Sequence, residues 1–100
     1  MPQKGRRRRG NRGRIPSPVN VGHRLITDAF VPYPEANRPE VLLEHAELEA
    51  IRLVDLEGLT QEEAGVRMGV SRGTVWRVLQ EARRKIAQAL TEGRRIQILT

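Results

Sequence analysis

The chain has 100 residues, of which 18 are Lys or Arg and 12 are Asp or Glu, and its net charge at neutral pH is +6. This length accommodates one domain with a modest core. The absence of cysteine excludes a disulfide scaffold and a thiolate zinc site. Without a long apolar run or the apolar centre of a signal peptide, the sequence predicts a cytoplasmic, prokaryotic protein with no membrane span.

The charge is distributed unevenly along the chain. Residues 1–14 hold seven bases and no acid, residues 35–63 hold nine acids against two bases, and residues 71–100 hold seven bases against two acids. This polarity would orient the protein on a polyanion, with its acidic side turned away.

Residues 1–14 are of low complexity and show no hydrophobic period, so the sequence predicts a disordered basic arm. Its run of Arg6, Arg7, Arg8 and Arg9 is suited to contact DNA phosphates or to lie in a minor groove. The alternative is a solvated tail that only improves solubility.

Residues 15–40 form an approach segment that contains five of the six prolines, which forbid a long helix. We predict that Phe30 and Tyr33 pack on the helical core. The apolar run Val41-Leu42-Leu43 then predicts a short strand at the start of a folded domain that spans residues 41–100.

The first helix is predicted over residues 46–57. Its apolar residues form a broad face suited to burial against both later helices: Leu48, Ile51, Leu53, Val54 and Leu56. The acids of residues 35–63 are interpreted as surface carboxylates without metal-ligand spacing.

Two helix starts follow at close spacing. Thr60 and Glu63 have the spacing of a capping box, which predicts a short helix over residues 61–68 that Gly69 closes. Ser71 is a second cap. The small Ala64 and Gly65 stand where two crossing helices must approach closely, so the pattern predicts a helix-turn-helix.

The second helix of this pair carries one apolar stripe of period 3.6: Val75, Val78, Leu79, Ala82, Ile86, Ala89 and Leu90. Gly93 is predicted to end it. The alternating tail, residues 94–99, predicts a strand that pairs with the Val41-Leu43 run, with the approach segment or with a second copy of the chain. The fold class is therefore mainly α, a three-helix helix-turn-helix domain with a few short flanking strands.

Basic and amide side chains lie opposite the apolar stripe. Arg72, Arg77 and Gln80 are predicted to reach base edges, because Arg matches guanine and Gln matches adenine in the major groove. The other candidate contact residues on this helix are Ser71 and Gly73 at its start, Trp76, and the basic run Arg83, Arg84 and Lys85, which would follow the phosphate backbone. Trp76 is predicted to be exposed, and the alternative is that its ring covers the seam with the first helix.

The stretch from Leu48 to Leu90, LEAIRLVDLEGLTQEEAGVRMGVSRGTVWRVLQEARRKIAQAL, resembles a small family of bacterial and archaeal proteins described as predicted DNA-binding proteins. Its turn also resembles the part of primary sigma factors that reads the upstream promoter element. Members of the small family carry proline at position 73, where this chain has Gly73. The resemblance implies DNA binding without defining a target sequence.

These patterns favour sequence-selective binding of double-stranded DNA and transcriptional regulation. A homodimer or the basic arm would add affinity to a single small module. The alternatives are a module that binds RNA polymerase or another factor, with Trp76 at its centre, and an RNA-associated protein that uses the Arg-rich arm. No catalytic constellation, metal site or cofactor motif is present in the sequence, so we do not expect an enzyme.

Overall fold

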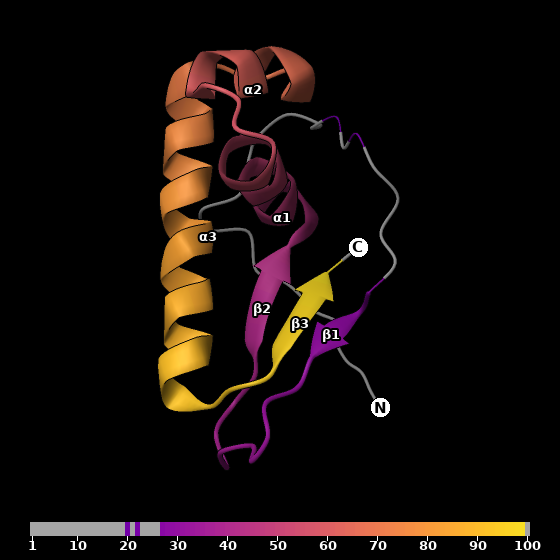
Figure 1. Cartoon of the computed structure of the whole chain (residues 1–100), viewed down its shortest axis with the longest axis vertical. Helices are drawn as coiled ribbons and strands as arrows, with labels where there is room; N and C mark the ends of the chain where they lie inside the picture. Colours follow the sequence, from indigo (N-terminus) through magenta and orange to yellow (C-terminus); the bar gives the residue numbers. More distant parts are fainter. Residues whose placement is uncertain (1–19, 21, 23–26, 100) are drawn as a thin grey trace.

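The computed structural model describes residues 20, 22 and 27–99. The elements in this part of the chain are β1 (Ala29–Phe30), β2 (Val41–Glu44), α1 (His45–Ile51), η1 (Arg52–Leu56), α2 (Gln61–Met68), α3 (Arg72–Glu92) and β3 (Ile96–Leu99). Figure 1 shows α3 along one side of the molecule, with α2 across its N-terminal end and the sheet beside its C-terminal half.

The first predicted helix forms, but its second half is wound differently from the first. After α1 the chain continues as η1, a π-helical segment in which the Glu57 N–H bonds to the Arg52 carbonyl at 2.9 Å. A π-helix takes more residues per turn, so side chains shift around the axis relative to an α-helix. Leu53 remains fully buried, whereas Leu56 is exposed, and the prediction that Leu56 joins the buried face is wrong.

The predicted pair of capped helices is confirmed. Thr60 Oγ1 accepts the Glu63 N–H at 3.0 Å while the Glu63 carboxylate accepts the Thr60 N–H at 2.8 Å, which closes the capping box. Gly69 ends α2 with a left-handed φ of 73°. Ser71 Oγ accepts the Thr74 N–H at 3.1 Å and starts α3, which Gly93 ends.

The short strands form one sheet of order β1-β3-β2 in the described part of the chain. β3 is antiparallel to β1 and parallel to β2, with Val41 opposite Ile96 and Leu43 opposite Ile98. The tail strand therefore pairs with two of its predicted partners, the Val41-Leu43 run and the approach segment. Alternation puts Leu43 and Ile98 on the face that packs against Ala82 of α3.

The core has two connected parts. One lies between α1, η1, α2 and the first half of α3, and its fully buried residues include Leu53, Met68 and Leu79. The other lies between the sheet and the middle of α3. The predicted stripe of α3 is buried or half-buried as far as Ala89, but Leu90, in the last turn of the helix, is exposed.

Two further packing predictions are wrong. Phe30 is exposed and Tyr33 is fully exposed, so neither covers the helical core. Both lie in or beside the proline-rich connection between β1 and β2, and this connection passes below the end of α3 rather than over its side (Figure 1). None of the helices in the described residues is long and apolar enough to span a membrane.

Candidate nucleic-acid interface

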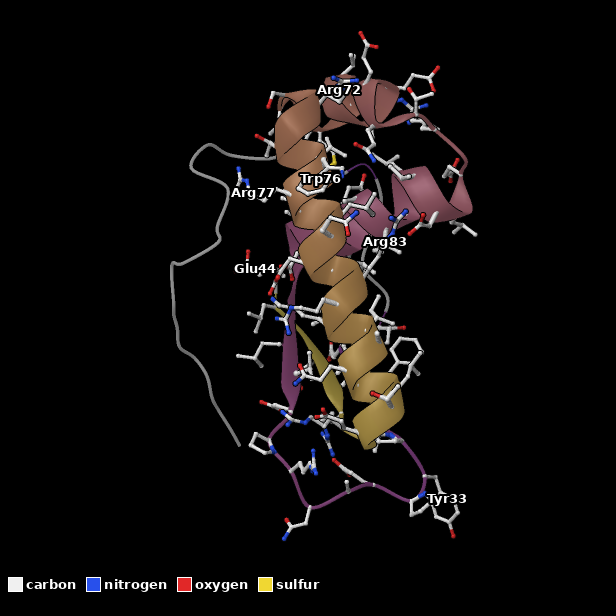
Figure 2. All side chains as sticks on the ribbon, turned by 90° about the vertical axis from the view of Figure 1, so that its left-hand side faces the viewer. Tyr33, Glu44, Arg72, Trp76, Arg77 and Arg83 are labelled. Atoms are coloured by element: carbon white, nitrogen blue, oxygen red, sulfur yellow. The ribbon has the colours of Figure 1, made fainter. Side chains whose placement is uncertain are left out.

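The N-terminal half of α3 presents six of the predicted contact residues to solvent. Ser71, Arg72, Gly73, Trp76, Arg77 and Gln80 are all exposed, and we refer to these six residues as the α3 surface. Figure 2 shows Arg72 where α3 meets α2, Trp76 and Arg77 further down the same helix, and Tyr33 at the opposite end of the molecule. The α3 surface is therefore remote from the loop that connects β1 to β2.

The start of α3 combines a polar cap with an open helix end. The Ser71 hydroxyl donates to Thr74 Oγ1 at 3.0 Å while it accepts the Thr74 N–H. These two hydrogen bonds fix the Ser71 side chain within the first turn. The first N–H groups of a helix have no acceptor within that helix, and the helix dipole favours an anion beside them.

The predicted basic contacts fall into two groups. Within residues 20, 22 and 27–99, neither Arg72 nor Arg77 forms an ion pair with a carboxylate. Arg83, in contrast, donates two bonds to Asp55 of η1, at 3.1 and 2.7 Å. Arg84 donates two to Glu81 on its own helix, at 3.2 and 2.6 Å.

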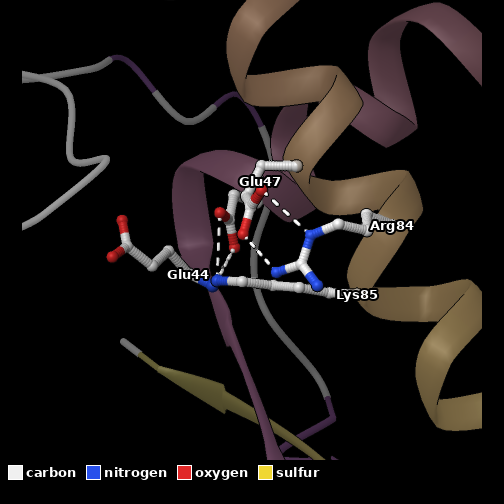
Figure 3. A network of polar contacts seen from close by, with 5 residues as sticks. Glu44, Glu47, Arg84 and Lys85 are labelled. Carbon is white, nitrogen blue, oxygen red and sulfur yellow. Dashed lines mark hydrogen bonds and ion pairs between the residues drawn. The ribbon is translucent and has the colours of Figure 1, made fainter.

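Lys85 belongs to a half-buried polar network rather than to the α3 surface (Figure 3). Its Nζ donates to both carboxylate oxygens of Glu47, at 2.8 and 3.1 Å, and Glu47 also accepts the Glu44 N–H at 2.9 Å. Burial raises the pKa of Glu47, and the bonds from Lys85 and from the Glu44 N–H oppose that effect. The network ties the start of α1 to the middle of α3.

Ion pairing distinguishes basic residues that the sequence analysis treats as one group. The side-chain hydrogen bond to Asp55 raises the pKa of Arg83, and the bond to Glu81 raises that of Arg84. These cations keep their charge, but a phosphate would have to compete with a carboxylate for them. Arg72 and Arg77 carry no such competition from the described residues.

Trp76 is exposed, as the helical spacing predicts, and 54% of its surface is open. The sequence pattern does not single out Val66, which is 79% exposed on α2 and is a second large apolar side chain on the helix-turn-helix. Val66 lies between the buried Gly65 and Met68 in the sequence. The apolar pattern of an eight-residue helix is too short to predict which of these residues is exposed.

Two buried carboxylates also escape prediction. The sequence places Glu47 and Glu49 among the surface acids, but the structure buries both of them almost completely, with exposures of 5% and 1%. Their partners are Lys85 and Arg52 respectively, and Lys85 stands 38 positions away in the chain. Only the Arg52 contact, at a spacing of three residues on one helix, leaves a signal in the local sequence.

The predicted contacts of Arg6, Arg7, Arg8 and Arg9 fall outside the described residues. Within the described ranges, no group of His, Asp and Glu side chains is arranged to hold a metal ion.

Comparison with known proteins identifies relatives in archaea and bacteria. The chain is 63% identical over 62 residues to the UPF0251 protein PF0620 of Pyrococcus furiosus, covering 62% of this chain and 57% of the relative. It is 40% identical over 87 residues to a UPF0251 protein of Archaeoglobus fulgidus, covering 87% and 83% of the two chains. It is 55% identical over 64 residues to a UPF0251 protein of Caldicellulosiruptor bescii, covering 64% and 46%.

The match to the Pyrococcus protein spans little more than half of that relative's length, whereas the Archaeoglobus match extends over most of both chains. No solved structure matches the chain. A family model described as "Protein of unknown function DUF134" matches residues 1–100. This chain therefore belongs to the DUF134 family, whose members in archaea and bacteria carry the name UPF0251.

Proposed function

We propose that this protein binds double-stranded DNA in a sequence-selective manner and regulates transcription. The observation that carries the proposal is the α3 surface, a capped helix start that exposes Arg72, Trp76 and Arg77 without a carboxylate partner for either arginine in the described residues. A helix of about 10–12 Å diameter with such side chains fits the major groove of B-DNA.

The contacts would divide between phosphate and base. The first-turn N–H groups of α3 would bind a phosphate beside Ser71, because helix starts attract anions. Arg72 and Arg77 would reach guanine edges and Gln80 an adenine edge. Trp76 would touch a sugar or a thymine methyl group.

The charge distribution supports the same orientation. Asp55, Glu47 and Glu49 lie on α1 and η1 rather than on α3, and each has a cationic partner. These pairs neutralise three of the nine acids of residues 35–63, which would otherwise repel a polyanion. Arg83, Arg84 and Lys85 remain candidates for phosphate contact, and we expect them to contribute less than Arg72 and Arg77, since each already binds a carboxylate.

Arg77→Ala tests the proposal against a matched arginine substitution. Sites would first be selected from random duplexes with the full chain, and affinity would then be measured on the selected and scrambled sequences. A bidentate base contact contributes about 1–3 kcal/mol of discrimination, so Arg77→Ala should weaken the selected duplex much more than the scrambled one. Arg38→Ala removes the same charge at a site paired with Glu92 and should leave the discrimination unchanged.

If no duplex is selected, the DNA proposal is wrong. Equal losses on the two duplexes would show instead that Arg77 contacts only phosphate.

Exposure of Trp76 and Val66 favours one other function, a module that binds RNA polymerase or another protein. Exposed aromatic side chains are common centres of protein interfaces. Polarisation measurements with a duplex, an RNA hairpin and purified polymerase would separate DNA binding from this alternative and from RNA binding through the basic arm.

A further inference from the structure

An ion pair with a buried carboxylate, at the junction of α1 and η1, contacts the backbone of Gly22. Glu49 is only 1% exposed, and its two carboxylate oxygens accept bonds from Arg52 Nε and Nη2 at 3.0 and 2.9 Å. Arg52 also bonds to Glu57 at 3.1 Å. A buried carboxylate is costly unless its charge is compensated and its oxygens are hydrogen-bonded.

The backbone of Gly22 completes this arrangement. Its N–H donates to Glu49 Oε2 at 2.7 Å, across 27 positions of the sequence. A Cβ at position 22 would lie 3.0 Å from Arg52 Nη2 and 3.1 Å from Glu49 Oε2. An added methyl group would therefore be tight, and the two side-chain atoms would have to move by a few tenths of an ångström to admit it.

A second contact lies two residues earlier, at the helix-turn-helix itself. The Asn20 N–H donates to the carbonyl of Met68, the last residue of α2, at 3.0 Å. The Asn20 side chain lies against Gly69, where a Cβ would be 3.2 Å from its Nδ2. The carbonyls at a helix end lack partners within the helix, so Asn20 supplies a donor where one is needed.

We propose that the Glu49–Arg52 pair is a positioning site that docks Gly22 and Asn20 beside the turn between α2 and α3, and so delivers the basic arm to DNA next to the α3 surface. The inference rests on the proposed function. Arg14 precedes Asn20 by six positions, a length of chain that spans at most about 20 Å. One turn of B-DNA rises about 34 Å. Arginine side chains tethered at Asn20 would therefore contact phosphates that flank the DNA sequence bound by α3.

Amide hydrogen exchange tests the docking in the absence of DNA. We expect the Gly22 and Asn20 N–H groups of the full-length protein to be protected from exchange. In Gly22→Ala the Asn20 N–H should lose this protection, while the N–H groups of Met68 and Leu79 should keep theirs. Exchange of both amides at the rate of an unstructured peptide in the unmodified protein would overturn the proposal, whatever the protein binds.

A four-variant comparison then tests the delivery of the arm. The variants are the unmodified chain, Gly22→Ala, the quadruple Arg→Gln change at positions 6–9, and the combination of both changes. Affinity for the selected duplex would be measured from 0.05 to 0.3 M salt. For every phosphate that the arm no longer neutralises, the salt slope should fall by about 0.9, so the loss of affinity should be about fivefold larger at 0.05 M than at 0.3 M salt.

We expect Gly22→Ala to weaken binding and reduce the slope in the chain with its arginines, and to have little effect once residues 6–9 are neutral. A purely structural role of Gly22 would weaken binding equally in both backgrounds, and that result would overturn the proposal. If the unmodified chain binds no duplex, the proposed function and the delivery of the arm fail together, while hydrogen exchange still decides whether Asn20 and Gly22 are docked.

Discussion

Trp76 shows how the position of one residue on a helix decides between packing and contact. It stands next to Val75, which is fully buried, and the turn of about 100° per residue carries the indole out of the core. A large ring on the buried side would meet the small Ala64 and the fully buried Met68, where extra volume is not tolerated. The exposed indole is therefore available to a partner.

Replacing Trp76 by Ala should reduce DNA binding more than stability. In the free protein we expect tryptophan emission typical of an indole in contact with water, and this emission should shift and become protected from quencher on addition of duplex. Since Trp76 is the only tryptophan, the signal has one source. Large destabilisation by the substitution, with unchanged affinity, would assign Trp76 to the fold instead.

Glu47 makes a definite contribution to the pH dependence of stability. Burial raises its pKa above the ordinary value of 4.5. A carboxyl group whose pKa is higher in the folded chain binds its proton more tightly there than in the unfolded chain. Protonation of Glu47 therefore stabilises the folded state, and this contribution is complete below pH 4.5. That contribution is lost as pH rises through the raised pKa.

The free energy of unfolding of the unmodified chain and of Glu47→Gln, from urea titrations across this pH range, isolates the effect. The advantage of the unmodified chain over Glu47→Gln should shrink as pH rises from below 4.5. A constant difference would show that the pKa of Glu47 is the same in the folded and unfolded chains.

Single residues are predictable where neighbours in the sequence decide their structure. Thr60, Gly69 and Ser71 take the conformations that their helix ends require, since each cap depends on a residue within three or four positions. The burial of Glu49 is not predictable in this way, because Gly22 approaches it from 27 positions away. For the same reason, the carboxylate partners of Arg83 and Lys85 become evident only in the folded chain.

At the scale of the elements, the contact between α2 and the turn that follows it depends on Gly65. A Cβ at this position would lie 2.7 Å from the carbonyl oxygen of Val70, a backbone atom fixed in the turn. Beyond its sequence neighbours and the backbone of its own helix, Gly73 in the first turn of α3 has no heavy atom nearer than 4.0 Å to the same added group. The two glycines form a matched pair, since both lie in helices.

Gly65→Ala should destabilise the protein, because the turn must move before α2 and α3 can pack. Gly73→Ala should instead stabilise it by up to about 1 kcal/mol, the advantage of alanine over glycine in an open helix. Thermal and urea unfolding of both variants would check the prediction. Comparable stability of the two variants would mean that the turn adapts at little cost.

The existence and order of the elements are largely predictable from the sequence, but their detailed faces are not. The helices begin and end close to the predicted residues, since caps and glycines mark them. The π-helical winding of η1 has no local signal, and it turns Leu56 outward. Phe30 and Tyr33 have large aromatic side chains, which favour packing in a core. Both are nevertheless exposed, because of the path that the chain takes between two strands.

At the scale of the whole molecule, charge is separated along the chain. We expect deletion of residues 1–14 to leave the fold intact, because every element in the described residues lies after residue 28. The deletion should lower affinity for all duplexes alike and reduce the salt slope by about 0.9 for each phosphate that the arm neutralises. Identical slopes for the truncated and full-length proteins would show that the arm makes no contact with DNA.

The parallel pairing of β2 with β3 joins the two ends of the helical unit. Val41 and Ile96 stand opposite each other although 55 positions separate them, and α1, η1, α2 and α3 all lie in between. Closing so long a loop has a large entropic cost that the local α2–α3 contacts do not share. Folding should therefore begin in the helices, with the sheet forming after the main barrier, so that Ile98→Val would accelerate unfolding and hardly change the folding rate.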